Sequence, residues 1–294
     1  MNLHTQTWNI AHCNCLITGA NTGLGRATAE TLAGAGAQVF MACRSPERAG
    51  PVADETRSFT KNPRVHVIAL DLASLTSVRA CADTFLELDL PLHVLINNAG
   101  RSGKGGLTAD GYELVFGTNH IGHFLLTMLL IERMIASAPA RIINVTSLSH
   151  RKLKTVDWSI AQRATPTEFT WPHPTYPVSK LANILFTKEL ARRLKGTGVT
   201  TYAVHPGVVA TEIWRVVPPR AQPLIKLLKP LMATSEKGAR TQIRCAMAPE
   251  LAQESGLFYS DGKIRAPSRL AQDSGLALEL WGLSEGWCGI ESPI

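Results

Sequence analysis

The stretch Cys15-Leu16-Ile17-Thr18-Gly19-Ala20-Asn21-Thr22-Gly23-Leu24-Gly25 decides the fold, because three glycines join an apolar run to a helical pattern. The apolar run over 15–17 predicts a buried strand, and the pattern over 26–34 predicts a helix. Glycines let the backbone turn sharply and approach a ligand, and amides at a helix N-terminus bind phosphate. The spacing differs from the commoner Gly-x-Gly-x-x-Gly, and an ordinary glycine-rich turn is the alternative. The flanking strand and helix favour a nucleotide-binding unit.

Strands and helices alternate along the rest of the chain. The patterns predict further strands over 38–42, 65–70, 92–96, 141–145, 199–204 and 256–260, and helices over 75–88, 112–135, 175–195 and 269–281. Such alternation is typical of a parallel sheet with helices on both faces. We therefore expect one α/β domain over 1–294 with a doubly wound, mostly parallel, seven-stranded sheet. Residues 10–150 would bind the dinucleotide, and residues 151–294 would carry the catalytic and substrate-binding groups.

Composition agrees with an intracellular globular chain. The 294 residues are 45% hydrophobic, enough for one large core. The longest apolar run, over 124–135, is broken by Glu132-Arg133 and is too short to span a bilayer. The N-terminus shows no signal peptide, and six scattered cysteines suggest a reducing compartment. We expect a cytoplasmic protein without a transmembrane anchor.

The net charge of +7 is spread along the chain, apart from a small cluster at Arg151, Lys152 and Lys154. Nucleic-acid binding would require a basic stripe interleaved with aromatic residues, which is absent. An anionic cofactor or an acidic membrane surface suits the charge equally well. Cys13-x-Cys15 beside His12 has no second pair at a ligand spacing, so we expect no metal site.

Arg44 follows the strand predicted over 38–42, and no acidic residue lies between Val39 and Ser45. In dinucleotide-binding folds an acid at this position binds the ribose hydroxyls of NAD. A guanidinium instead suits the extra phosphate of NADP, to which it can bond through two nitrogens. The alternative is a solvated loop arginine.

Polar residues also end the next three strands. Asp71, followed by Leu72, either accepts from an adenine amino group or caps a helix beginning near Ser74. Asn97-Asn98-Ala99-Gly100 and Thr146-Ser147 end the strands over 92–96 and 141–145, at the edge where open α/β sheets bind ligands. Asn119 interrupts an apolar helix, where its amide requires a hydrogen-bonded network. The Pro-rich connection over 148–174 is long enough to be functional.

Tyr176-Pro177-Val178-Ser179-Lys180 opens the helix predicted over 175–195. Residues four apart share a helix face, so the ammonium of Lys180 would favour the phenolate of Tyr176 and lower its pKa. Such a tyrosine exchanges protons near neutral pH. A second match, Tyr259-Ser260-Asp261-Gly262-Lys263, contains Asp-Gly and therefore predicts a turn.

Residues 218–232 combine four prolines with six large apolar residues and two lysines. Such a segment closes over an apolar substrate, contacts a membrane surface, or packs in the core. These three alternatives remain open from the sequence.

Taken in order, these motifs resemble the short-chain dehydrogenase/reductase family over nearly the whole chain. The resemblance depends on Thr18-Gly19-x-x-x-Gly23-x-Gly25, Asn97-Asn98-Ala99-Gly100, Asn119, Ser147, Tyr176-x-x-x-Lys180 and Pro206-Gly207. The sequences around Arg44, Asn119 and Pro206 look like the retinol-dehydrogenase-like branch, which includes the WW-domain oxidoreductases. We expect neither a WW-type repeat nor the N-terminal anchor helix common in retinol dehydrogenases.

The resemblance implies a Rossmann-type fold and an NADP(H)-dependent oxidoreductase that interconverts a lipophilic alcohol and carbonyl. Ser147 would hold the substrate oxygen, Tyr176 would exchange the proton, Lys180 would bind the nicotinamide ribose, and Asn119 would complete a water-linked proton relay. The cofactor set implied is Thr18, Gly19, Asn21, Thr22, Gly23, Leu24, Gly25, Arg44, Asp71, Leu72, Asn98, Ala99, Gly100, Tyr176, Lys180, Pro206, Gly207, Val209 and Thr211.

Several alternatives stay open beside this interpretation. A non-catalytic NADP-binding regulatory protein is the rival function, although it would not need a proton donor. Family members commonly pair through the two long helices, here 112–135 and 175–195, so a homo-oligomer is left open. Peripheral membrane contact is left open as well.

Overall fold

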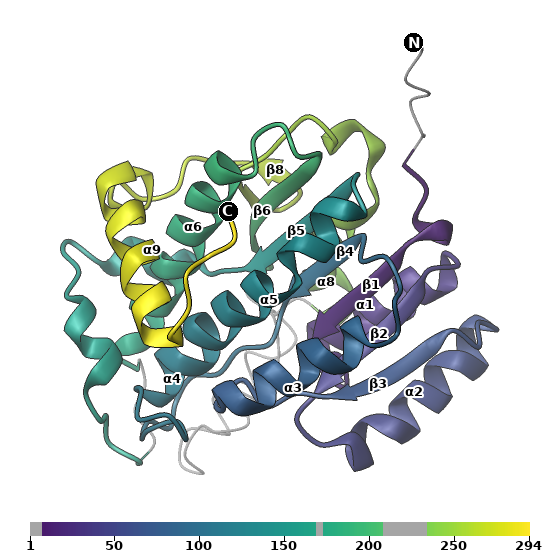
Figure 1. Ribbon diagram of the computed structural model, residues 1–294, viewed down its shortest axis with the longest axis horizontal. Coiled ribbons are helices and arrows are strands. Elements are labelled where there is room, and N and C mark those ends of the chain that lie inside the picture. Colours follow the sequence, from purple (N-terminus) through teal and green to yellow (C-terminus); the bar gives the residue numbers. More distant parts are fainter. Residues whose placement is uncertain (1–7, 169–172, 208–233) are drawn as a thin grey trace.

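A single mixed sheet forms the centre of the structure, a computed structural model that describes residues 8–168, 173–207 and 234–294. Its strand order is β3-β2-β1-β4-β5-β6-β7-β8 (Figure 1). The strands are β1 (Asn14–Thr18), β2 (Gln38–Cys43), β3 (Val65–Ala69), β4 (Val94–Asn97), β5 (Ala140–Val145), β6 (Val199–His205), β7 (Leu257–Ser260) and β8 (Lys263–Ile264). All neighbouring pairs are parallel except β7 with β8. The predicted doubly wound, mostly parallel fold is confirmed.

The eighth strand corrects the expected number of seven. Asp261 and Gly262, between β7 and β8, have φ values of 53° and 69°. Two successive residues with positive φ make the tight turn that joins antiparallel strands, which confirms the turn predicted from Asp-Gly. The two-residue β8 was missed because it is exposed and has no apolar alternation.

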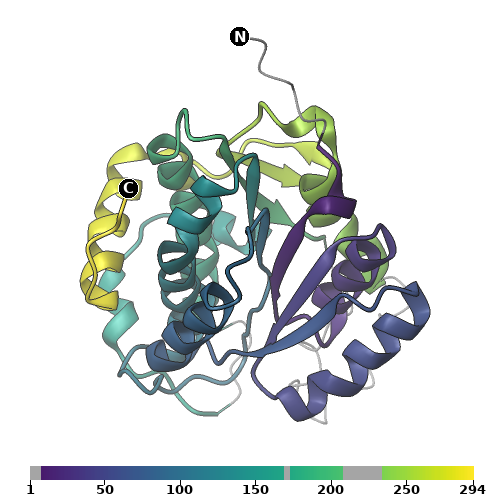
Figure 2. The ribbon, with the colours of Figure 1, turned by 45° about the vertical axis from the view of Figure 1, so that its right-hand side comes forward.

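Helices cover both faces of the sheet, and the described ones are α1 (Gly23–Gly34), α2 (Pro46–Thr60), α3 (Leu75–Leu86), α4 (Leu114–Phe116), α5 (Gly122–Ala136), α6 (Thr175–Arg193), α8 (Ser235–Met247) and α9 (Ser274–Cys288). Side chains of α3, α5, α6 and α9 share one apolar cluster with Leu16, and those of α1, α2 and α8 share another with Cys15 and Ile17. Figure 2 shows these two layers on either side of the sheet. Successive strand residues point to opposite faces, so every central strand is buried on both sides.

Helices α2 and α8 had no counterpart among the sequence predictions. Their buried faces consist of small or polar residues, such as Ala49 and Ala53 in α2 and Gly238 and Ala239 in α8. Helical periodicity is recognised from large apolar residues, so helices that pack through small side chains escape it. The closing helix was also misplaced: α9 begins five residues later than the predicted start at 269 and ends beyond 281.

The predicted helix over 112–135 contains a π-helical segment, Gly117–Ile121, between α4 and α5. Together they form a helix over Leu114–Ala136, long and apolar enough in its 23 residues to cross a membrane. The run over 124–135, expected to be too short to span a bilayer, is therefore only part of a helix that is long enough. The protein itself buries 83% of its apolar window, as expected of a core helix.

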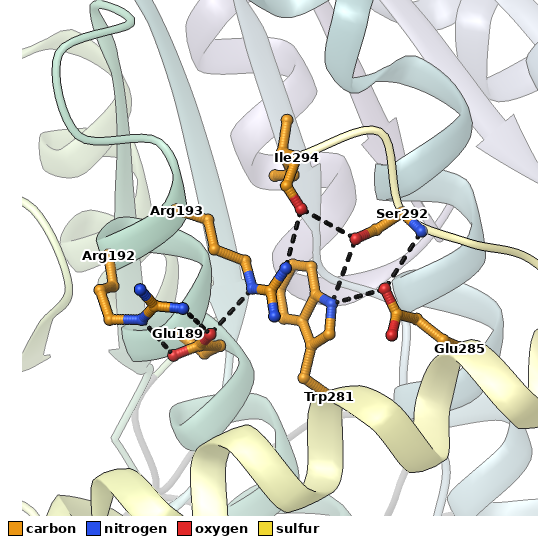
Figure 3. A network of polar contacts seen from close by, with 7 residues as sticks. All are labelled: Glu189, Arg192, Arg193, Trp281, Glu285, Ser292 and Ile294. Atoms are coloured by element: carbon orange, nitrogen blue, oxygen red, sulfur yellow. Dashed lines mark hydrogen bonds and ion pairs between the residues drawn. The ribbon is translucent and has the colours of Figure 1, made fainter.

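The C-terminal segment packs on the layer that contains α5 and α6. Trp281 of α9 lies edge-on to Phe124 of α5 and beside Phe186 of α6, with ring centroids 5.2 and 5.9 Å away. The guanidinium of Arg193 lies 4.2 Å from the centroid of a Trp281 ring, and its Nη1 donates to the oxygen of Ile294 at 2.8 Å (Figure 3). The C-terminal segment thus covers part of α5 and α6. These are the two helices through which the sequence analysis left homo-oligomer formation open.

All six cysteines are buried and free. Burial raises the pKa of each thiol, for example that of Cys81 to about 12, so these side chains behave as small apolar groups. Among the described residues, no group of three or more His, Cys, Asp or Glu side chains could hold a metal ion.

Candidate functional site

The glycine turn between β1 and α1 leaves room for a ligand at the carboxyl edge of the sheet. A Cβ on Gly25 would lie 2.3 Å from the carbonyl oxygen of Gly19, so only glycine fits this close contact. Gly23 has a φ of 54° and no atom within 4 Å of the corresponding position. The side chain of Thr22 does not cap α1. The first amides of α1 are therefore available to a phosphate, and the turn fits a dinucleotide.

Thr18 connects this turn to the end of β4. Its Oγ1 accepts from the backbone amides of Asn98 and Ala99 at 3.0 and 2.9 Å. The side-chain Nδ2 of Asn98 donates in turn to the backbone oxygen of Thr18 at 2.8 Å. The strand order places β1 between β2 and β4, where the connections diverge to opposite sides. Ligands of open α/β sheets bind at such a point.

Lys180 and Tyr176 meet at the same edge, beside β5. The Nζ atom of Lys180 donates to the backbone oxygen of Val145 at 3.0 Å and lies 5.7 Å from the centroid of the Tyr176 ring. A Cβ on Gly100 would lie 3.4 Å from this Nζ and 3.5 Å from Oδ1 of Asn119, so both side chains border the end of β4. Burial lowers the pKa of Lys180 to about 8.

The expected direction of the Tyr176 pKa was wrong for the chain without a ligand. Burial raises the pKa of this phenol, and the opposing influence is a hydrogen bond with Ser147 that lowers it. A buried ammonium whose own pKa is lowered, separated from the ring by 5.7 Å, does not outweigh the loss of hydration. Tyr176 and Ser147 are nevertheless brought together as predicted.

Asn119 sits in the π-helical segment and is completely buried. Its Oδ1 accepts from the amide of Arg101 at 2.8 Å, and its Nδ2 donates to the oxygen of Arg101 and to Oγ of Ser179, both at 3.0 Å. The side chain therefore holds the segment after Gly100 against α6. The network predicted for this buried amide is present, and its part in a proton relay stays a prediction.

The remaining predicted cofactor residues lie around this edge. Arg44 is exposed directly after β2. Asp71 does not cap α3, because its Oδ1 accepts from the amide of Ala73, whereas Ser74 caps the helix by accepting from Ser77. Leu72 is buried, and Asn21 and Leu24 are half-buried in the glycine turn. Contact of Asp71 with adenine stays a prediction.

Pro206 and Gly207 follow β6, and Gly207 has a φ of 82° that favours glycine. His205, at the end of β6, is buried, which lowers its pKa to about 4. Val209, Thr211 and the segment 218–232 lie outside the described residues, so the three alternatives for that segment stay open.

Two buried histidines near the site escaped the sequence analysis. The Nδ1 atom of His150 donates to the backbone oxygen of Ser147 at 2.6 Å, and its Nε2 accepts from the amide of Ser268 at 3.0 Å. His123 contacts both Thr18 and Asn119. Their proximity in sequence to Ser147 and Asn119 was the available signal.

Comparison with known proteins agrees with this geometry. Residues 14–157 match the family described as short chain dehydrogenase. Human retinol dehydrogenase 12 is 46% identical over 278 residues, which cover 94% of this chain and 86% of that protein. Human retinol dehydrogenase 11 is 45% identical over 270 residues, with coverage of 92% and 83%. The crystal structure of a putative uncharacterized protein from Mycobacterium Paratuberculosis superposes with a TM-score of 0.76 at 33% identity, covering 98% of both chains.

The chain belongs to the short-chain dehydrogenase/reductase family, whose members are nicotinamide-dependent oxidoreductases acting on alcohols and carbonyls. Within it, the chain is retinol-dehydrogenase-like, because relatives of that name match nearly its full length.

Proposed function

We propose that the protein is an NADP(H)-dependent reductase of lipophilic aldehydes or ketones, with retinoid-like molecules as the first substrates to test. The observation that carries the proposal is the position of Tyr176 beside buried Lys180, whose Nζ lies 5.7 Å from the centroid of the ring, at the edge of the sheet that holds the glycine turn. A proton donor, an oxygen-binding hydroxyl and a dinucleotide site together constitute a carbonyl-reducing site.

The proton chemistry follows from the environment of Tyr176. Because burial raises its pKa, the phenol stays protonated at neutral pH and is ready to donate to a carbonyl oxygen. Ser147 donates a second hydrogen bond to that oxygen as negative charge develops. A bound nicotinamide supplies the hydride in this direction. Lys180 would bind the nicotinamide ribose, and Asn119 would hold the water that returns a proton toward Lys180.

The preference for NADP(H) is proposed from Arg44, directly after β2, and Arg101, after β4. Arg44 is exposed where the ribose of a dinucleotide is expected. Burial, and after it the charge of Arg44, lowers the pKa of the Arg101 guanidinium. Asp71 and Glu113 oppose this effect. An additional phosphate beside these positive charges would be stabilised. The absence of an acid at the end of β2 supports the same preference.

The lipophilic substrate is proposed from the relatives called retinol dehydrogenase 11 and 12, at 45% and 46% identity. A cytoplasmic location is proposed on two grounds, the six free cysteines and the cofactor. The division at about residue 150, into a dinucleotide-binding half and a catalytic half, is proposed as well.

The experiment is a screen of NADPH oxidation over aldehydes and ketones of increasing apolar size, including retinal and steroids. We expect turnover that rises with apolar size and disappears in Tyr176→Phe, which keeps the ring but lacks the exchangeable proton. Tyr176→Phe should still bind NADPH. The matched control is Tyr259→Phe, which removes a hydroxyl that bonds Glu254 and should retain turnover. Unchanged activity of Tyr176→Phe would end the proposal.

A further inference from the structure

His123 lies between the two halves of the candidate site. It is 2% exposed and belongs to the first turn of α5, directly after the π-helical segment. Its Nε2 lies 2.9 Å from Oγ1 of Thr18, and its Nδ1 lies 3.0 Å from the backbone oxygen of Asn119. One imidazole therefore contacts both Thr18, which holds the end of β4, and Asn119, which holds the segment after Gly100 against α6.

The partners determine where the protons lie. The backbone oxygen of Asn119 can only accept, so Nδ1 of His123 carries the hydrogen and Nε2 is left as an acceptor. The Thr18 hydroxyl then donates to Nε2 at 2.9 Å rather than to the more distant backbone oxygen of Ile96 at 3.4 Å, and its two lone pairs accept from the amides of Asn98 and Ala99. Every hydrogen-bonding position of the hydroxyl is used. Burial, assisted by the charge of Lys180, lowers the pKa of His123 to about 4, so the imidazole keeps this neutral form at working pH.

The chain of contacts continues beyond Asn119. The Asn119 side chain donates to Oγ of Ser179, and this hydroxyl donates to the backbone oxygen of Tyr176 at 2.9 Å. All four of the linked side chains, those of Thr18, His123, Asn119 and Ser179, are buried. A displacement at either end can therefore be transmitted through hydrogen bonds that water does not replace.

We infer that His123 is a positioning residue that couples the dinucleotide-binding end of β4 to the π-helical segment that carries Asn119. Through Nε2 it orients the Thr18 hydroxyl and so aligns the backbone of Asn98 and Ala99 for the cofactor. Through Nδ1 it anchors the π-helical segment and so places Asn119 and, through Ser179, the start of α6. The inference rests on the proposed function, because it assigns cofactor binding to the end of β4 and proton transfer to Asn119 and the start of α6.

Two substitutions separate the two hydrogen bonds. The amide of asparagine overlays Nδ1 of histidine, so His123→Asn keeps the donor to Asn119 and loses the acceptor for Thr18. The amide of glutamine reaches the place of Nε2, so His123→Gln keeps the acceptor for Thr18 and loses the donor to Asn119. His120→Asn is the matched control, because His120 is 1% exposed on the same helix, and asparagine keeps the Nδ1 contact with Asn183 while losing the Nε2 bond to Ser284 of α9. The measurements are the NADPH dissociation constant by fluorescence titration, kcat at saturating NADPH, and Tm.

We expect His123→Asn to bind NADPH about tenfold more weakly with kcat within about twofold of wild type. His123→Gln should show the opposite pattern, with binding within about twofold and kcat reduced about tenfold or more. His120→Asn should lower Tm without changing either parameter. Equal losses in both His123 variants, or losses that only follow Tm, would overturn the inference. If the wild-type protein reduces no carbonyl, the proposed function fails, and the binding titrations alone still decide the Thr18 contact.

Discussion

Arg44 tests the cofactor preference at the scale of one residue. Its guanidinium is expected to form a charge-assisted hydrogen bond with the ribose phosphate that only NADPH carries. Arg44→Ala should therefore weaken NADPH binding by about tenfold or more and leave NADH nearly unchanged. Arg48→Ala is the control, because Arg48 is an exposed arginine of the adjacent helix α2. Equal losses for the two cofactors would assign Arg44 a structural role.

Lys180 tests the energetic cost of the candidate site. Its pKa falls from 10.5 to about 8 because the ammonium is buried. Between these values the unfolded chain holds the proton and the folded chain does not, so the free energy of unfolding rises with pH across this window. Below pH 8 the ammonium is protonated in both states, and the folded protein bears the full free-energy cost of burying its charge. Lys180→Met should therefore be more stable than wild type at pH 7, by on the order of 2 kcal/mol, although inactive.

The advantage of Lys180→Met should shrink as the pH rises from 8 to 10, and urea unfolding at several pH values measures it. The oxygen of Val145 keeps a donor in the variant, because Nδ2 of Asn183 lies 3.3 Å away. A stability difference that does not depend on pH would show that the burial of charge is not its cause.

At the scale of elements, the site depends on close packing of α5 against the segment after β3. A Cβ on Gly122 would lie 2.6 Å from the backbone oxygen of Leu72, so Gly122→Ala forces the two apart. We expect a loss of about 1–3 kcal/mol in the free energy of unfolding and weaker NADPH binding. Thermal unfolding measures the loss of stability, and fluorescence titration measures the NADPH binding.

Gly282→Ala in α9 is the matched control for this substitution. No atom lies within 4 Å of the added methyl group, and Gly282 is exposed. Alanine favours the helix by about 0.5–1 kcal/mol over glycine, so this variant should be more stable than wild type. Destabilisation by both alanines would mean that the contact with Leu72 is not responsible.

At the scale of the whole molecule, the C-terminal segment closes the apolar layer over α5 and α6. Trp281 is 2% exposed, and its Nε1 donates to Glu285 at 2.9 Å (Figure 3). Trp281→Ala should lower the free energy of unfolding by about 3–5 kcal/mol. Leu278→Ala, on the same helix but 54% exposed, should change it by less than about 0.5 kcal/mol. Chemical denaturation distinguishes them, and similar losses would contradict the packing described here.

The same variants examine the oligomeric state. If α9 covers the surface through which subunits would pair, Trp281→Ala should expose apolar area on α5 and α6 and increase self-association. Light scattering of the wild type and of both α9 variants measures this directly.

The positions of the strands along the chain and the residues at their ends were predictable from the sequence, because both depend on local patterns. Apolar runs such as 15–17 and 199–204 mark buried parallel strands. Gly25 allows a contact that a Cβ would block, and Gly262 has a positive φ that favours glycine. Helices α2 and α8 were not predictable in this way, because small residues carry no strong periodicity.

Only the tertiary structure decided how the polar groups at those strand ends behave. The sequence placed Lys180 four residues after Tyr176 and suggested a lowered phenol pKa, but the sign depends on burial, which arises from elements distant in the chain. The roles of His123 and His150 likewise come from backbone partners that the fold brings within 3.0 Å. Local sequence determines which groups can hydrogen bond, whereas packing determines which water molecules they lose and which neighbours replace them.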